Sequence, residues 1–478
     1  MRLINVKTGH MQEFFDDDIP NYAILSHTWG PEEVTFQEYE QQVPSLRQKK
    51  GYSKIRGLCA EAGQKQLDFV WIDTCCIDKK SSSELSEAIN SMFQWYKGSQ
   101  TCFVYLEDVS AEDLPSAADS SFRRSRWFTR GWTLQELLAP KRVLFYDCDW
   151  RFIGIRMNMR DLIAEITGIK ERFIEDAKGD FHAGVAEKLC WASHRRTTRR
   201  EDEAYCLMGL FGINMPLLYG EGSNAWRRLQ EEIIKATSDQ SILAWGLSTH
   251  HVPASRTINR GTLLSSSALC FQGWDVEVWS GEAKHHYFMT NLGLHIGLNV
   301  IELEVLGSKS VNVSNGIALL ECKVSPFSHG DAKIALPISW TRSQDETEGL
   351  LIASRAAGSN PFLVPASTQG QAVRKMAYLT SYPTNMLIGY FQKIHWSHMQ
   401  RLGYQVTDYY PPQAFELCQG DSFNWAFNPS IPQRNRAIIK FVTVEGDAVL
   451  LLLVQTTADS PGVSGPAGGE LGTVRAAR

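Results

Sequence analysis

The sequence predicts an α/β domain with a parallel sheet and flanking helices, followed by a helical extension and a β-rich C-terminal domain. Two observations predict the first part: four short runs are apolar throughout, and amphipathic helical patterns separate them. Strands that are apolar on both faces are typical of parallel sheets covered on both sides by helices. A third observation is the change after residue 247 to short alternating runs punctuated by Gly, Ser and Asn, which predicts strands.

The elements of the first part follow in a regular order, and residues 1–150 are assigned to this domain. The predicted strands are Tyr22–His27, Phe69–Asp73, Thr101–Glu107 and Arg142–Asp147. The first helical pattern places Ile55, Leu58, Cys59 and Ala62 on one face. Ser81 and Glu84 have capping-box spacing and open a helix that reaches about Gly98. The stretch around Trp132 is predicted to be the last helix before the fourth strand.

Residues 151–247 are predicted to be helical and residues 248–458 to be mainly β. The helical patterns are Arg156–Ile169, Ala183–Arg196 and Asn224–Thr237, and Thr198 with Glu201 has the spacing of a second capping box. Residues 459–478 are rich in Gly, Pro, Ala and Ser with almost no large apolar groups, so this tail is predicted to be disordered.

Composition and the N-terminal sequence limit which partners are expected and in which compartment the protein is expected to act. The 478 residues include 48 Lys+Arg and 53 Asp+Glu, so the formal charge of −5 gives no overall attraction for nucleic acid or anionic lipid. The N-terminal sequence contains charged residues within its first few positions and lacks the apolar core of a signal peptide. This predicts a cytoplasmic protein. The longest apolar run, Ala448–Val454, is too short for a membrane span. None of the ten cysteines forms a CxxC pair, and we expect free thiols and no metal site.

Three long segments of the sequence resemble the signature motifs of a known family. "YAILSHTWG", "WIDTCCIDKKSSSELSEAINSMFQWY" and "RGWTLQELLAP" are similar to the motifs of the fungal heterokaryon-incompatibility (HET) domain, in the same order and at about the same spacing. The stretch "CWASHRRTTRREDEAYCLMGLFGINMPLLYGEGSNAWRRLQEEI" resembles the segment that follows this domain in incompatibility proteins of the D/E type. The resemblance covers roughly residues 22–245. No phosphate-loop motif or WD-type repeat follows it.

The resemblance implies a role in vegetative incompatibility, in which non-self recognition between fungal cells ends in programmed cell death. HET domains are distantly similar to TIR domains, which implies a flavodoxin-like sheet and, as in some TIR domains, cleavage of NAD. It also implies self-association through the HET domain and a partner that senses non-self, such as an NLR-type protein. NAD would be a substrate, and no cofactor is expected.

Glu136 is the residue to which the resemblance assigns catalysis. Enzymatic TIR domains place a glutamate on a helix after the third or fourth strand, often four residues after a tryptophan, and Trp132 and Glu136 match that pattern. On a helix these two side chains share a face. A carboxylate there can stabilise the ribosyl cation that forms when an N-glycosidic bond breaks. The structural alternative is a glutamate that pairs on its helix with Arg130 or Lys141.

Further candidates for substrate binding lie directly after predicted strands, where open α/β sheets bind their ligands. Ser26 and His27 end the first strand and could meet a ribose or phosphate, although they could equally form a packed turn. Trp29 could stack on a base, but core packing is favoured for it. Asp73 ends the second strand and could hold ribose hydroxyls or cap the following turn. Arg126 and Arg130 flank the helix of Glu136 and could face a pyrophosphate, although an exposed, solvated position is the default for both.

Two other features favour structural roles. Cys75 and Cys76 are expected to be buried thiols because no base stands next to them in the sequence. The run from Arg195 to Arg200 holds four arginines, but the acidic residues that follow it favour a salt-bridged junction over a nucleic-acid patch. A non-enzymatic interaction module remains the alternative function.

Overall fold

The structure is a computed structural model. It describes residues 1–15, 18–110, 112–175, 183–247, 262–273, 278–280, 287–303, 313–324, 332–341, 350–355, 361–380, 394–395, 404–410, 422–423, 436–443 and 449–455. The chain divides into two compact units, residues 1–182 with 191–229 and residues 183–190 with 230–478. The predicted tail at 459–478 lies outside the described residues. No helix in the described ranges combines the length and the apolar character that crossing a bilayer requires.

The N-terminal unit is built on a seven-stranded sheet with the order β2-β1-β4-β3-β5-β6-β7. The strands are β1 (Arg2–Asn5), β2 (Met11–Glu13), β3 (Tyr22–His27), β4 (Phe69–Trp71), β5 (Thr101–Tyr105), β6 (Val143–Tyr146) and β7 (Phe152–Ile155). The central strands β4, β3, β5 and β6 are parallel, as predicted. The outer strands pair antiparallel. The sheet therefore extends on both sides of the four predicted strands and reaches residue 155.

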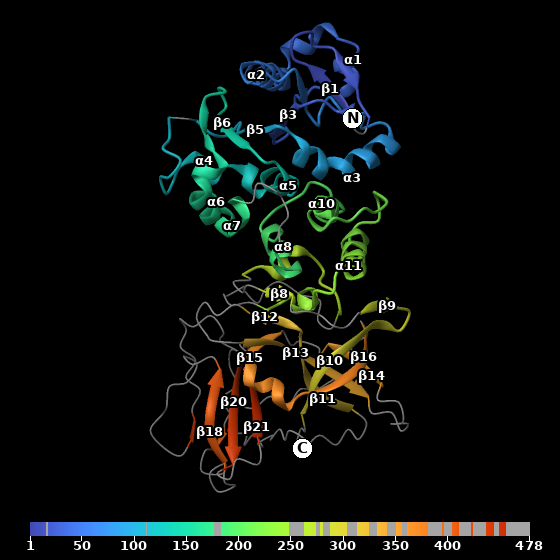
Figure 1. The fold of residues 1–478 in the computed structure, drawn as a ribbon, viewed down its shortest axis with the longest axis vertical. Helices are drawn as coiled ribbons and strands as arrows, with labels where there is room; N and C mark the ends of the chain where they lie inside the picture. The colour runs from blue at the N-terminus through green and yellow to red at the C-terminus, as the bar shows by residue number, and fades with distance from the viewer. Residues whose placement is uncertain are drawn as a thin grey trace, which may run out of the picture. The chain divides into compact units, whose positions relative to one another are not determined.

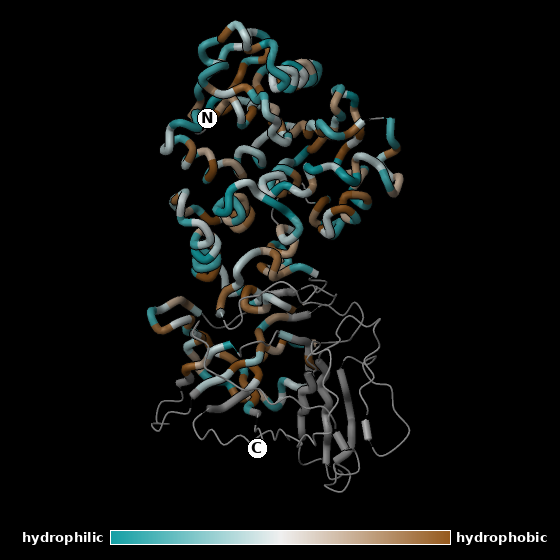
Figure 2. The backbone as a smooth tube through the Cα atoms, turned by 180° about the vertical axis from the view of Figure 1, so that it is seen from behind, coloured by the Kyte–Doolittle hydropathy of each residue, from teal (hydrophilic) through white to brown (hydrophobic). Residues whose placement is uncertain are grey.

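Helices cover both faces of the parallel strands. The elements are α1 (Phe36–Glu40), η2 (Pro44–Gln48), α2 (Lys50–Gln64), α3 (Ser82–Gly98), α4 (Ser121–Arg124), η3 (Arg126–Thr129) and α5 (Thr133–Leu138). On one face, the Tyr22 hydroxyl donates to the Trp95 carbonyl of α3. On the other face, the Tyr146 hydroxyl donates to Glu61 of α2 at 2.8 Å. The sheet is thus the middle layer between α2 and α3 (Figure 1). Hydrophobic and hydrophilic residues are interspersed along the backbone of the N-terminal unit (Figure 2).

The predicted capping boxes form only in part. Ser81 caps α3 by accepting from the Glu84 amide, but the Glu84 carboxylate binds Arg2 and the Asp78 amide in place of the Ser81 amide. The second box, at Thr198, is wrong. Helix α9 (Asp202–Tyr205) starts after Glu201, whose side chain accepts from the backbone amides of Gly220 and Gly222. Glu84 thus finds its donors in Arg2 of β1 and in the turn before α3, whereas Glu201 finds them in a loop about twenty residues later in the chain.

The remaining helices follow the sheet, as the helical patterns predict. They are η4 (Arg156–Met159), α6 (Arg160–Thr167), α7 (Glu171–Glu175), α8 (Val185–Ala192), α9, α10 (Met208–Phe211), α11 (Asn224–Ala236), η5 (Gln240–Ala244) and η6 (Ala268–Phe271).

The C-terminal unit is rich in β-strands, as predicted. The strands are β8 (Val278–Ser280), β9 (Phe288–Thr290), β10 (Gly293–Leu303), β11 (Val313–Leu319), β12 (Cys322–Val324), β13 (Ala332–Thr341), β14 (Leu350–Arg355), β15 (Phe362–Pro365), β16 (Val373–Thr380), β17 (Ile394–His395), β18 (Tyr404–Tyr410), β19 (Ser422–Phe423), β20 (Arg436–Thr443) and β21 (Val449–Gln455), with η8 (Ala366–Gln371) between β15 and β16. The order β11-β10-β16-β14-β13 closes into a barrel because β11 also pairs with β13. Ile301, Ile317 and Leu319 form part of its core.

Candidate functional site

The candidate site begins where β3 ends, at the centre of the parallel strands. Successive residues of a strand face opposite sides of the sheet. The Ser26 side chain therefore faces α5, whereas the side chain of its neighbour His27 lies on the α2 side, near Glu33 and Asp73. The residues predicted to form one site are thereby divided into separate groups.

The first group is a buried acid with its partners, which we call the acid cluster: Ser26, Tyr96, Trp127 and Glu136. Glu136 is only 6% exposed. It accepts a hydrogen bond from the Ser26 hydroxyl, which in turn accepts from the Trp127 indole at 2.8 Å. The Tyr96 hydroxyl is also hydrogen-bonded to Glu136 and donates to the Leu25 carbonyl at 2.9 Å. The acid cluster thus joins β3, α3, η3 and α5 within the core.

Glu136 is held in its protonated form at neutral pH. Burial raises its pKa to about 8, and the negative charge of Asp73 adds to that increase, while the hydrogen bonds from Ser26 and Tyr96 and the charge of Arg195 oppose it.

The second group lies at the edge of the sheet, and we call it the rim cluster: His27, Trp29, Asp73 and Lys79. Trp29 is 51% exposed, so the prediction that it packs in the core is wrong. Its indole donates to Asp73 at 2.8 Å, and the Lys79 ammonium lies 3.4 Å from the centre of the ring. An indole N–H prefers a polar partner, and the carboxylate after β4 supplies one at the surface.

His27 is the buried member of the rim cluster. Its Nε2 atom lies 3.8 Å from Glu33 and 3.9 Å from Asp73, and it has no hydrogen-bond partner among the described residues. Burial and the positive charges of Lys54 and Lys79 lower its pKa to about 3, against the opposing charge of Glu33. The imidazole is therefore neutral at physiological pH.

Two charged residues complete this edge, of which the sequence singled out Arg126 but not Lys54. Lys54 of α2 is 4% exposed and donates to the Thr28 carbonyl at 3.1 Å and to Glu33 at 2.5 Å. Arg126 donates to the Thr28 hydroxyl at 3.1 Å and to Glu107 at 2.9 Å. These contacts link the loops that follow β3 and β5. Periodicity places Lys54 on a helix but cannot reveal a partner far away in sequence.

Arg130 and Trp132 are directed toward the helical extension. Arg130 donates to the Thr198 hydroxyl at 3.1 Å, and the Trp132 indole is hydrogen-bonded to Asp202. Trp132 is the residue that precedes the first turn of α5. The structure therefore brings Glu136 together with Ser26, while Trp132 has its polar contact elsewhere.

Two structural expectations have clear outcomes. Cys75 and Cys76 are buried free thiols, and burial raises the pKa of Cys75 well above its usual value, as expected for unreactive groups.

The arginine run from Arg195 to Arg200 joins the helical extension to the α/β part, since Arg195 donates to the Arg130 carbonyl at 2.9 Å. The predicted salt bridges are wrong, because among the described residues no carboxylate lies within 4.0 Å of these four arginines.

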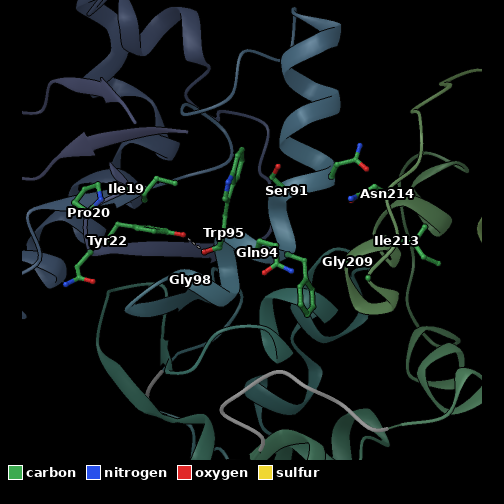
Figure 3. Close-up of a pocket in the computed structure, with 14 residues that line it drawn as sticks. Ile19, Pro20, Tyr22, Ser91, Gln94, Trp95, Gly98, Gly209, Ile213 and Asn214 are labelled. Atoms are coloured by element: carbon green, nitrogen blue, oxygen red, sulfur yellow. Dashed lines mark hydrogen bonds between the residues drawn. The ribbon is translucent and has the colours of Figure 1, made fainter. Parts of the chain in front are cut away.

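A cavity of about 600 Å³ lies beside α3 and does not include the acid cluster. Its lining is uncharged, with Trp95, Tyr22 and several amide side chains along it. Figure 3 shows Trp95 between Tyr22 and Ser91, with the Tyr22 hydroxyl bonded to the backbone of α3. Glu136 does not line this cavity.

Comparison with known families identifies the part of the chain that forms the centre of this sheet. Residues 22–121, from β3 into α4, match the family model described as heterokaryon incompatibility protein (HET). The chain contains a HET domain. The match includes Ser26, the rim cluster and α3, whereas Glu136 follows it in the sequence.

Two further comparisons give matches to this chain. A stretch of 223 residues is 45% identical to the vegetative incompatibility protein HET-E-1 of Podospora anserina, and this match covers 45% of the present chain but only 16% of that relative. Residues 224–280 match a domain of unknown function, DUF8212. No solved structure matches the chain. The HET domain and its relative support a role in vegetative incompatibility.

Proposed function

We propose that this chain is an effector of fungal vegetative incompatibility that acts in the cytoplasm and causes cell death by cleaving NAD. The observation that supports this most strongly is the acid cluster, which lies on the same sheet as the HET match. An acid that is 6% exposed, with its pKa raised to about 8, stands at the carboxyl end of a central parallel strand. Strongly perturbed acids are concentrated at catalytic sites, and open α/β sheets bind ligands at this edge.

The order of the parallel strands supports the comparison with TIR and flavodoxin-like domains. In chain order, β4-β3-β5-β6 is a 2-1-3-4 arrangement. This is the beginning of the flavodoxin-like order, in which the switch point lies between the first and third strands. Here that point lies between β3 and β5, where Thr28 and Glu107 are linked by Arg126.

The proposed reaction breaks the bond between the ribose C1′ and the nicotinamide nitrogen. The bonding electrons go to nicotinamide, water supplies an oxygen to C1′, and one proton is released with ADP-ribose. The positive charge of the nicotinamide ring would lower the pKa of Glu136 and favour the carboxylate that stabilises the ribosyl cation. Glu136 is only 6% exposed, so a substrate can reach it only once the chain opens. In the proposed mechanism, η3 moves away from Ser26 and takes the Trp127 side chain with it.

Nicotinamide release by the purified chain tests this proposal, with a forced oligomer included because self-association is expected to activate the domain. We expect Glu136→Gln to reduce release at least about a hundredfold, the usual loss when one group that stabilises transition-state charge is removed. The matched control is Glu171→Gln, which changes an exposed acid of α7 and should leave release unchanged. Equal release by Glu136→Gln and wild type would overturn the assignment.

The second candidate function is a non-enzymatic module whose self-association recruits an NLR-type or other death partner. The burial of Glu136 favours it, because a carboxyl with hydrogen bonds to Ser26 and Tyr96 can serve the core alone. This function requires an exposed surface, so Arg56→Glu on α2 should abolish assembly measured by light scattering while Glu136→Gln preserves it. Assembly and killing without nicotinamide release would establish this alternative.

A further inference from the structure

A second cavity, of about 270 Å³, lies in the N-terminal unit, and no residue of the acid cluster lines it. It is formed by the segment from α4 to η3, the end of α6, and the end of α8 with the residues that follow it. Its lining includes Arg123, Arg124, Phe128, Trp191, His194 and Arg195. It is thus rich in guanidinium groups and has aromatic walls.

The arginines of this cavity have few negatively charged partners. Arg123 pairs with the exposed Glu165 at 2.7 Å. Arg124 donates to the Asp119 carbonyl, and Arg195 donates to the Arg130 carbonyl and the Thr133 hydroxyl, at 2.9 and 3.0 Å. Among the described residues, neither Arg124 nor Arg195 has a carboxylate within 4.0 Å. Arg124 is exposed, whereas Arg195 is partly buried, and a cation in a protected place is normally paired because leaving it unpaired is costly.

Two donor atoms of the lining residues also remain without acceptors. Arg123 Nε and Arg195 Nη2 are buried and have no hydrogen-bond partner in the part of the chain that the structure describes. Glu136 cannot neutralise Arg195, because burial keeps that acid largely protonated at neutral pH. An anion in the cavity would supply both the missing charge and the missing acceptors.

We propose that this cavity binds a small phosphate monoester. The planar fork of Arg matches the oxygens of phosphate and binds them in pairs. The hydroxyls of Ser125, Thr129 and Thr167 donate within the protein, so the guanidinium groups supply the ligand's donors. The volume of about 270 Å³ is at the small end for ligand sites. It suits a nucleoside monophosphate or a smaller ester. This site does not rest on NAD cleavage.

Calorimetric titration of the full chain tests the proposal with inorganic phosphate, AMP and malonate as probes. We expect the two phosphates to bind and to bind more tightly than malonate. Arg124→Gln should weaken phosphate binding at least about tenfold, the loss of one charged hydrogen bond. Arg195→Lys, which keeps the charge but removes the fork, should weaken it similarly.

The control is Arg47→Gln, an exposed arginine of η2 that lies outside this cavity and should bind phosphate like the wild type. Thermal unfolding of each variant checks that the fold is intact, and Arg124→Gln keeps the test decisive if Arg195→Lys unfolds. Phosphate binding that is equal in wild type and Arg124→Gln, or malonate binding as tight as phosphate binding, would overturn the proposal.

Discussion

Ser26 is the residue through which the acid cluster is connected, because its hydroxyl both donates to Glu136 and accepts from the Trp127 indole. Ser26→Ala removes the hydroxyl with which the Glu136 carboxyl and the Trp127 indole N–H form hydrogen bonds. We expect it to lower the free energy of unfolding by roughly 1–3 kcal/mol. Urea denaturation measures the change, and Ser45→Ala, at an exposed position of η2, should have almost no effect. Equal midpoints for Ser26→Ala and Ser45→Ala would contradict the described hydrogen bonds.

Glu136 also makes stability depend on pH. Its pKa is about 8 in the folded chain and 4.5 in the reference state. Between these values the unfolded chain binds fewer protons, so stability falls as pH rises from 4.5 toward 8. A difference of this size corresponds to at most about 5 kcal/mol.

Glu136→Gln removes this pH dependence. We expect the variant to unfold at nearly the same urea concentration as wild type at pH 5 and at a clearly higher concentration at pH 8.5. Measuring both midpoints at the two pH values isolates the contribution of one carboxyl. A constant difference between wild type and variant across this range would show that Glu136 has an ordinary pKa.

Part of the acid cluster follows from the sequence at the scale of single residues. Ser26 ends a strand and Glu136 lies on the helix before another strand of the same sheet, so a meeting of the two was foreseeable. Trp127 and Tyr96 were not, because hydrophobic periodicity shows only that a ring faces inward. Which polar group its N–H or O–H meets depends on packing between segments far apart in the chain.

At the scale of elements, helix α2 provides a matched pair of glycines. A Cβ on Gly57 would lie 2.2 Å from the Trp150 ring, whereas a Cβ on Gly63 would meet only Val6 at 3.6 Å. Gly57→Ala should therefore destabilise the chain by about 1–3 kcal/mol through overpacking.

Gly63→Ala supplies the control within the same helix. Alanine favours helix more than glycine does, so this variant should be as stable as wild type or more stable by up to about 1 kcal/mol. Thermal unfolding of both variants compares them directly. If Gly57→Ala were as stable as Gly63→Ala, the packing of Trp150 on α2 would be wrong.

The sequence predicts the central elements better than the outer ones. The strand at Tyr22–His27 and helices α2 and α3 are confirmed, because each has an uninterrupted apolar run or a clear helical period. The outer strands β1, β2 and β7 are not predicted. They are only three or four residues long, and β2 and β7 are partly exposed, so antiparallel pairing, and not composition, makes them strands.

At the scale of the whole molecule, the sequence predicted both an α/β part and a β-rich part, but not the closure of the latter into a barrel. Closure depends on the pairing of β11 with β13, which no local pattern specifies. The match to the HET family supports a role of the N-terminal unit in incompatibility. The chemical step proposed for that role depends on one buried acid.

Killing of fungal cells by the expressed chain tests most directly whether Glu136 is that acid. The comparison is between wild type, Glu136→Gln and the control Glu171→Gln, all at equal protein abundance. We predict that wild type and Glu171→Gln kill and lower cellular NAD, while cells that express Glu136→Gln survive with NAD unchanged. If Glu136→Gln killed as effectively as wild type, catalysis by this acid would be contradicted.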